Sequence, residues 1–202
     1  SPSDFYEHPH TQINEYLTKV VHPIIGEYDA PGAPANYSAT PWEITSPAPT
    51  LDQHGKEIIN ELKSYNHSKS PKEDTKKETR LPLEGIRVLA FERVWAAPFG
   101  TRYLADFGAE VIKVESTRFS DGRVFDKSIN PSAWLNTNST YGEINRNKKS
   151  ITLDLHTEEG QKIFKDLVKV SDVVVENNAP GAMKKFNLAY EDLKEIKEDI
   201  IL

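Results

Sequence analysis

Residues 83–115, LEGIRVLAFERVWAAPFGTRYLADFGAEVIKVE, decide the fold that we expect for this chain. An apolar run over 86–91 has the length of a strand, and Pro98 suits the first turn of a helix, where its missing N–H costs nothing. Gly108 marks the end of that helix, and a second apolar run follows over 111–114. The apolar positions of the helix recur at helical spacing, at Tyr103, Leu104 and Phe107. This pattern predicts a strand–helix–strand unit, and therefore a parallel sheet.

The turn after the first strand, residues 92–97, is the first place to look for a ligand, because ligands of parallel sheets bind at the carboxyl ends of the strands. Ala96 and Ala97 are small enough to let a ligand approach the backbone, and free N–H groups at a helix start favour anions. A plain strand-to-helix connection has the same pattern. The turn lacks the G-x-G-x-x-G pattern of NAD-binding domains, with Trp95 and Pro98 where small or flexible residues are needed.

Outward from this unit, the pattern continues toward the C-terminus. Alternating apolar residues over 151–155 predict a strand, and residues 173–175 predict a further buried strand. Between them, Thr157 is a good N-cap for a helix. The helix has one apolar face for packing, at Ile163, Phe164, Leu167 and Val168. We therefore predict an α/β fold, with a Rossmann-like parallel sheet and flanking helices.

Composition excludes several classes of protein and site. The net charge of -6 argues against a nucleic-acid surface, and no apolar run is long enough to span a membrane. The absence of cysteine excludes disulfides and thiolate catalysis, and the six histidines lack metal-ligand spacing, so we expect no metal. With no signal-peptide pattern at the start, the cytoplasm is the expected compartment.

Three parts of the chain differ in composition. Residues 1–64 are rich in proline and aromatic residues; within them, 20–28 could be a strand pair or one leg of a hairpin, and 55–62 reads as a short amphipathic helix. Residues 65–80 carry many charges and no large aliphatic side chain, so we predict a polar linker. Residues 81–202 form the α/β segment described above.

This segment resembles the opening of family III CoA-transferases (the CaiB/BaiF type). That group includes formyl-CoA:oxalate and carnitine CoA-transferases, and 2-methylacyl-CoA racemases are related to it. Four matching segments occur in the expected order, namely 83–115, NRNKKSITLDL at 145–155, DVVVENNAPG at 172–181, and FNLAYEDLKEIKEDIIL at 186–202. The resemblance implies the Rossmann-like large domain of the family, with the small domain absent from this chain.

The N-terminal part resembles the closing segment of the same family. The matching motifs are His22-Pro23 with Gly26, the Ser-x-Thr-Pro turn at 38–41, the Ala-Pro pair at 48–49, and the final helix at 55–62. The order is therefore tail, linker, head, which we interpret as the junction of a tandem protein, with circular permutation as the rival explanation. Because the two ends of a family member meet in the large domain, tail and head could still build one domain.

The resemblance also implies a coenzyme A site. In the family, the turn after the first strand lies against the pantetheine and diphosphate of CoA, so Val94, Trp95 and Ala96 would line that groove. Relatives often carry a basic residue directly after the acid that ends the second strand. Here Ser116 stands at that position, and we expect Arg118 to meet a CoA phosphate instead, although a solvated strand end is an equally open alternative.

Two segments supply further expected contacts with CoA. Asn145 and Lys148 lie in a loop with two asparagines and three basic residues, which suits phosphate or adenine, although a charge run is more often a solvated loop. Leu153 and Leu155 correspond to positions near the adenine in relatives. Their alternation is equally what a buried strand needs.

The strand over 173–175 leads into the last group of expected contacts. We expect Asn177 to retain a contact with CoA, whereas Asn178 replaces an aromatic residue that packs on the adenine in relatives. Lys184 and Lys185 lie where relatives place a basic residue for a CoA phosphate, and we expect Lys185 to make that contact. A solvated helix face is the alternative for this pair.

The function implied by the resemblance is transfer of CoA between an acyl-CoA and a small carboxylic acid. In the family an aspartate attacks the acyl-CoA to form a mixed anhydride, and the reaction then passes through an enzyme–CoA thioester. We expect that aspartate outside this chain, which alone would be inactive. The aspartates that do not match its position are Asp106, Asp121, Asp126, Asp154 and Asp172.

The expected partners are an acyl-CoA, a carboxylic acid and the rest of the transferase chain, and the full-length protein is expected to form an interlocked homodimer. Two alternatives remain open. One is part of a 2-methylacyl-CoA racemase, which works by proton transfer. The other is a non-catalytic module for CoA binding or assembly.

Overall fold

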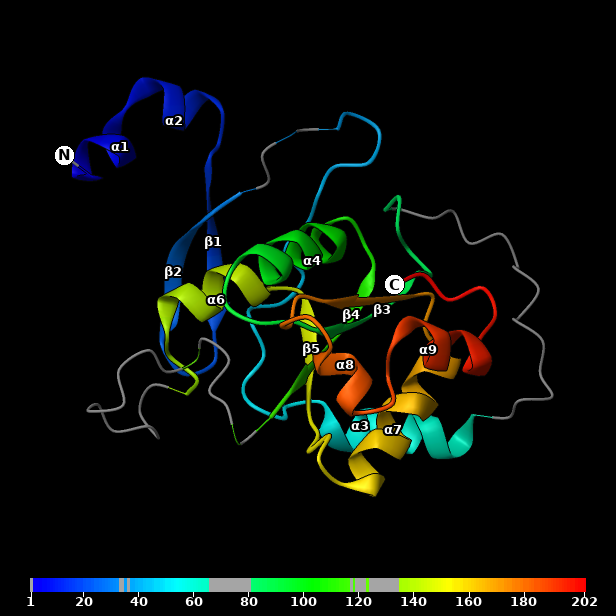
Figure 1. Cartoon of the computed structure of the whole chain (residues 1–202). Coiled ribbons are helices and arrows are strands. Elements are labelled where there is room, and N and C mark those ends of the chain that lie inside the picture. Colours follow the sequence, from blue (N-terminus) through cyan, green and yellow to red (C-terminus); the bar gives the residue numbers. More distant parts are fainter. Residues whose placement is uncertain are drawn as a thin grey trace.

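The computed structural model describes residues 2–32, 35, 37–65, 81–116, 118, 123 and 135–202. Its centre is a four-stranded sheet in the order β5-β4-β3-β6, in which every neighbouring pair is parallel (Figure 1). The strands are β3 (Arg87–Phe91), β4 (Glu110–Glu115), β5 (Lys148–Thr152) and β6 (Val173–Glu176). The predicted α/β class with a parallel sheet and flanking helices is confirmed.

Helices cover both faces of this sheet. Helix α4 (Ala96–Asp106) lies on one face, with α6 (Ser139–Asn145) beside it. Figure 1 shows that the remaining helices of the α/β body lie on the opposite face. These are α3 (Gly55–Ser64), α7 (Glu158–Lys169), α8 (Ala182–Lys185) and α9 (Tyr190–Ile196).

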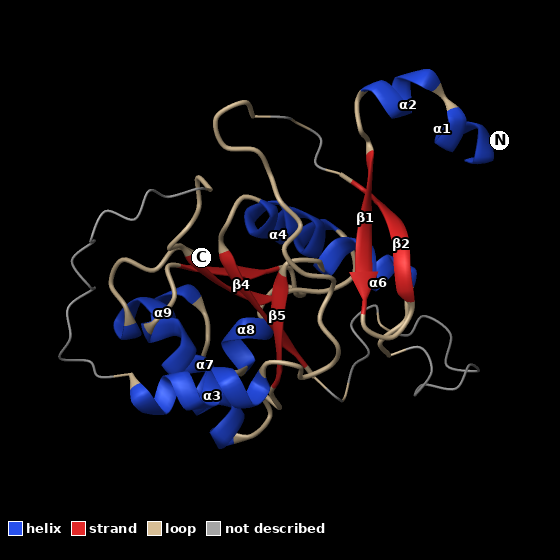
Figure 2. Ribbon diagram, turned by 180° about the vertical axis from the view of Figure 1, so that it is seen from behind, coloured by secondary structure: helices blue, strands red, loops and turns tan. Residues whose placement is uncertain are grey.

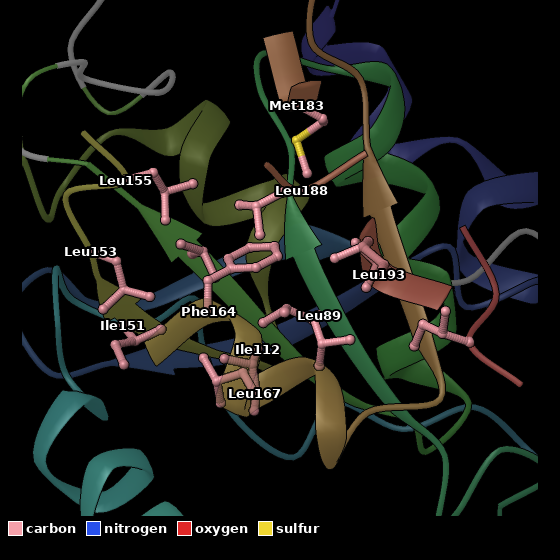
Figure 3. Packing of buried hydrophobic residues seen from close by; sticks show 14 of the residues in the cluster. Leu89, Ile112, Ile151, Leu153, Leu155, Phe164, Leu167, Met183, Leu188 and Leu193 are labelled. Atoms are coloured by element: carbon pink, nitrogen blue, oxygen red, sulfur yellow. The ribbon is translucent and has the colours of Figure 1, made fainter. Parts of the chain in front are cut away.

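The hydrophobic core has two layers, one on each face of the sheet. On the α7 side, Phe164 is fully buried among leucines and isoleucines of the sheet and of α7 and α9, together with Met183 of α8 (Figure 3). On the α4 side the buried residues are small, including Ala90 and Ala105, so that helix and sheet pack closely. This two-layer burial is the reason why the central strand β3 reads as an almost continuous apolar run, RVLAF.

The central strand–helix–strand unit has the predicted order of elements, but the predicted apolar face of its helix is wrong. Tyr103, Leu104 and Phe107 are only partly buried, whereas α4 buries Pro98, Thr101, Arg102, Ala105 and Asp106, two of them charged residues that pair with each other or with neighbours. Pro98 is the third residue of α4, where its missing N–H leaves no hydrogen bond unmade. The helix ends before Gly108, which has φ +100. A Cβ atom at Gly108 would lie 2.6 Å from the Cβ of Leu81, so both the backbone conformation and the space require glycine.

Strand β5 begins three residues earlier than the sequence indicated. The prediction was a strand over 151–155 after a polar loop, whereas the structure has β5 at Lys148–Thr152 and places Asn145 at the end of α6. The reason is that Lys148 and Ser150 are buried inside the protein, where Lys148 pairs with Glu92. Polar residues therefore occupy core positions of β5, and for this reason its first residues lack the alternating apolar pattern by which a strand is predicted from sequence.

The N-terminal residues form an arm at one side of the α/β body (Figure 2). The arm contains α1 (Pro2–Glu7), α2 (Pro9–Ile13) and an antiparallel hairpin of β1 (Leu17–His22) and β2 (Gly26–Pro31). The hairpin confirms the strand pair expected over 20–28. Helix α3 likewise confirms the helix expected over 55–62.

Residues 43–58 join the α/β body along the free edge of β5. The Asn147 side chain accepts hydrogen bonds from the Thr45 and Ser46 N–H groups at 2.8 and 3.0 Å and donates to the Glu43 carbonyl at 2.6 Å. Further along, the Thr152 N–H donates to Asp52 at 2.7 Å. This part of the chain therefore covers a sheet edge that would otherwise expose unpaired backbone groups.

Helix α3 contributes to the same core, since Ile58 is 1% exposed and packs in the α7-side cluster. Residues before and after the predicted linker thus share one hydrophobic core. The boundaries of the tail, linker and head stay a prediction, and apart from Tyr65 the linker lies outside the described residues.

Candidate functional site

A cavity of about 240 Å³ opens at the carboxyl ends of the parallel strands. Segments that follow all four strands contribute to it, at the place where ligands of such sheets bind. Its lining residues are Phe91, Arg93, Ser116, Leu153, Leu155, His156, Asn178, Ala182, Lys185 and Phe186. Four residues singled out from the sequence, at 153, 155, 178 and 185, therefore meet in one cavity.

The walls of this cavity are apolar and aromatic. Leu153 and Leu155 are buried and belong to the hydrophobic core, as Figure 3 shows. The rings of His156 and Phe186 stand edge to face, with their centroids 5.2 Å apart. Sequence reasoning did not select either aromatic residue, although each directly follows a residue that it did select, Leu155 or Lys185.

The rim of the cavity is rich in positive charge. Arg93 and Lys185 line it, and Arg118 lies beside it, bound to Asp154 through Nε and Nη2 at 2.9 Å each. Asp154 also accepts a hydrogen bond from the His156 N–H at 3.1 Å. The His156 N–H, together with Arg118, holds the pKa of Asp154 below its usual range. The ionised Asp154 side chain thus holds Arg118 next to the cavity through their ion pair.

The turn between β3 and α4 lies next to the cavity and is largely exposed. Val94 and Trp95 are 52% and 51% exposed, and Ala96 begins the helix. Val94 has φ +64, a left-handed conformation that is costly for a β-branched residue. Of the turn, only Arg93 lines the cavity itself, so the three residues predicted for the pantetheine groove lie on the adjoining surface.

Asn145 and Lys148 lie away from the cavity, buried beneath this turn. The Lys148 ammonium donates to Glu92 Oε1 at 2.7 Å, to the Pro98 carbonyl at 2.9 Å and to Asn145 Oδ1 at 3.0 Å. Burial lowers the pKa of Lys148 to about 8, despite the opposing charge of Glu92. The two residues thus support the turn from below, and their predicted contact with CoA stays a prediction.

Asn177 and Asn178 also contact the turn. The Asn177 side chain accepts from the Arg93 N–H at 2.7 Å and donates to the Arg93 carbonyl at 2.9 Å. Asn178 donates to the Phe91 carbonyl at 3.1 Å. Asn178 therefore both lines the cavity and holds the end of β3, whereas the amide of Asn177 is directed at the backbone of Arg93.

Two buried carboxylates that sequence reasoning did not select organise the strand ends. Glu92 accepts from the Thr101 hydroxyl at 2.8 Å in addition to Lys148. Glu115 is bound by Arg123 Nε at 2.7 Å and by the Ser150 hydroxyl at 2.6 Å. Burial opposes ionisation of Glu115, but Arg123 outweighs it and holds the pKa below its usual range. Both carboxylates could have been selected from the sequence, because each belongs to an acidic residue at the end of an apolar strand.

Among the described residues, no three His, Asp or Glu side chains come together in a way that could hold a metal ion. In the same part of the chain, no helix has the length and apolar character needed to cross a membrane. The expectation of a site without metal stays a prediction.

Comparison with known proteins finds relatives that are named as CoA-transferases. The chain is 46% identical over 121 residues to the succinyl-CoA:glutarate CoA-transferase of Mus musculus, covering 59% of this chain and 27% of that protein. It is 40% identical over 124 residues to the succinyl-CoA–L-malate CoA-transferase beta subunit of Chloroflexus aurantiacus, covering 61% of this chain and 30% of that one. The chain thus spans less than a third of the length of these relatives.

Solved structures agree with the sequence comparison. The crystal structure of a CaiB/BaiF family protein from Brucella suis matches with a TM-score of 0.51 and 39% identity, over 57% of this chain and 31% of that chain. The sequence profile of the family described as CoA-transferase family III matches residues 1–55 and 83–202. Because this match includes both the N-terminal arm and the whole parallel sheet with its strand-end cavity, the chain belongs to CoA-transferase family III.

Proposed function

We propose that this chain forms the CoA-binding part of an enzyme that transfers CoA between an acyl-CoA and a carboxylic acid. The observation that carries the proposal is the cavity at the strand ends, which combines apolar walls with a cationic rim. CoA offers a matching combination, since its adenine has flat aromatic faces that can pack on apolar side chains and its phosphates are anionic. Arg93, Arg118 and Lys185 would meet the phosphates.

The cavity also supplies a place for the adenine. His156 and Phe186 present aromatic rings beside Leu153 and Leu155, and a base can stack on such a ring. This pair would replace the stacking face that Asn178 does not provide. From there, the pantetheine would run along the exposed turn at 94–96, where the small side chain of Ala96 leaves the backbone accessible.

For the acyl donor we propose succinyl-CoA, because the names of the two relatives above both specify it. For the acceptor we propose a small dicarboxylic acid, since glutarate and malate appear in those names. The same names favour a transferase over a racemase.

We further propose that the reaction uses an aspartate from the rest of the protein. Of the five aspartates named from the sequence, Asp121 and Asp126 lie outside the described residues and the other three are engaged in contacts of their own. Asp106 binds Arg146 at 2.8 Å, Asp154 binds Arg118 at 2.9 Å, and Asp172 accepts from the Arg87 N–H at 2.8 Å. A nucleophilic carboxylate must be free to attack the thioester carbonyl. The chain by itself is therefore expected to bind CoA without turning it over.

We also propose that the full-length protein is a cytoplasmic homodimer.

Titration calorimetry of the chain with CoA tests the proposal. We expect saturable binding of CoA and none of NAD. Lys185→Ala should weaken CoA binding by about three- to fivefold, because an exposed lysine contributes a modest charge interaction with a phosphate. Lys184→Ala is the matched control, since Lys184 is an exposed neighbour that does not line the cavity.

Equal losses in the two lysine variants would indicate a general charge effect and would count against this cavity as the phosphate site. If CoA does not bind the unchanged chain at all, the proposal fails. A role in assembly would then be the better description of the chain.

A further inference from the structure

Three successive carbonyl groups at the end of β3 each accept a hydrogen bond from a side chain of a neighbouring strand or of the turn after it. The Phe91 carbonyl accepts from Asn178 Nδ2 at 3.1 Å, and the Glu92 carbonyl accepts from Lys113 Nζ at 3.0 Å. The Arg93 carbonyl accepts from Asn177 Nδ2 at 2.9 Å. The backbone is thus held by side chains at the point where the sheet hydrogen bonds stop.

Asn177 differs from the other two donors because it binds the same residue twice. Its Oδ1 accepts from the Arg93 N–H at 2.7 Å while its Nδ2 donates to the Arg93 carbonyl. Two bonds to one residue fix the orientation of both peptide groups that flank it. Since the C=O and N–H of a trans peptide point in opposite directions, directing the Arg93 carbonyl at Asn177 turns the Val94 N–H away from it.

The residue after this clamp is the strained one. Val94 has φ +64, which is rare for a β-branched residue and persists only where the surroundings impose it. Packing of its own side chain cannot impose it, because Val94 and its neighbour Trp95 are both half-exposed. The restraint must come from the backbone on either side, which is held by Asn177 at Arg93 and by α4 from Ala96 onward.

We propose that Asn177 is a positioning residue, which holds Val94 in its left-handed conformation and so sets the direction of Trp95 and the backbone N–H groups of the turn. The sequence alone had suggested a direct contact between Asn177 and CoA. In the structure both polar atoms of its amide bind Arg93 instead. That the positioned turn serves CoA rests on the function proposed above, whereas the hold on Val94 does not.

The test is a cycle of Asn177→Ala, Val94→Gly and the double variant, compared by amide NMR without ligand and by calorimetry with CoA. In Asn177→Ala we expect the amide signals of residues 93–96 to shift or broaden, with CoA binding about tenfold weaker for the loss of two hydrogen bonds. Glycine adopts positive φ at little cost, so Val94→Gly in the Asn177→Ala background should restore part of both effects. Asn60→Ala, an exposed asparagine on α3, is the matched control.

Each result has a defined meaning. A rescue by Val94→Gly that is larger in the Asn177→Ala background than in the unchanged protein supports positioning, because relief of strain at residue 94 by itself would act equally in both backgrounds and a lost ligand contact would not be repaired. Additive effects of the two substitutions, or unchanged 93–96 signals in Asn177→Ala, would overturn the proposal. If the unchanged chain fails to bind CoA, the proposed function falls, while the NMR comparison still decides the role of Asn177.

Discussion

At the scale of single residues, the buried pair of Glu92 and Lys148 determines how the end of β3 is held. Both side chains are fully buried, with Lys148 Nζ 2.7 Å from Glu92 Oε1. Removing two charges from water is costly, and the pair survives because each partner has further polar contacts, with Thr101 on one side and Asn145 on the other. A single substitution in this pair would leave an uncompensated charge in the core.

The pair should also give the protein a distinctive pH dependence of stability. The pKa of Lys148 is about 8 in the folded protein, against 10.5 for an ordinary lysine. Between these values the unfolded chain binds more protons than the folded chain. The free energy of unfolding should therefore rise with pH across this window, by up to about 3 kcal/mol, and be flat below it. Urea unfolding at a series of pH values measures this rise.

The double variant Glu92→Gln/Lys148→Met should lack this rise, since it removes the titrating amine together with its partner. Lys149→Met is the matched control and should keep it. Although burial opposes the charge of Lys149, the hydrogen bonds that it donates to Glu110 and Glu57 raise its pKa, so its contribution is lost only above the usual lysine range. Parallel curves for the unchanged protein and the double variant would show that Lys148 does not titrate in this window.

At the scale of elements, α4 is positioned by its two ends. Its start follows the left-handed Val94, and its end is followed by Gly108 with φ +100. Both positions have positive φ, and they reverse the chain between the parallel strands β3 and β4. The conformations at its ends, in addition to the packing of Ala105, therefore place this helix over the sheet.

We expect Gly108→Ala to lower the free energy of unfolding by about 2 kcal/mol, because alanine is strained at this φ and its Cβ would meet the Cβ of Leu81 at 2.6 Å. Gly100→Ala is the comparison within α4, where an added Cβ has no atom within 4 Å. It should raise stability by about 0.5–1 kcal/mol, since alanine favours a helix interior. Equal effects of the two substitutions on urea unfolding would contradict the assigned role of Gly108.

At the scale of the whole molecule, residues from both sides of the predicted linker complete one structure. The segment around Asp52 covers the edge of β5, and Ile58 enters the core between α3 and the sheet. The resemblance implies that the two ends of a family member meet in one domain, and such an arrangement would bring these distant segments together. Whether they come from one unit or from neighbouring units of a tandem stays a prediction.

Limited trypsin digestion checks this arrangement. The basic residues of the predicted linker should be cut first, because that segment has no large aliphatic side chain to bury. The two fragments should then elute together in gel filtration, held by the shared core. In Ile58→Ala, which loses about 2–5 kcal/mol of core packing, they should separate. Rapid loss of residues 1–64 from the unchanged protein would contradict a shared domain.

The sequence alone determined the parallel β3–α4–β4 unit and the capped helix α7, and it pointed to the strand ends where the cavity lies, because these depend on local periodicity and on turn residues. It also selected Leu153, Leu155, Asn178 and Lys185, which the fold brings into one cavity. These residues could be selected because the direction of a side chain follows from its position within a helix or strand.

The tertiary structure decided the rest. It placed Lys148 in a strand beneath the turn instead of in a polar loop, directed Asn177 at the backbone of Arg93, and paired His156 with Phe186. The residue type of a lysine or asparagine does not reveal whether its side chain lies in a solvated loop or in a buried contact. The difference is set by partners such as Glu92, which lies 56 residues away in the chain. Burial and pairing between such distant residues are products of the fold, and no local pattern encodes them.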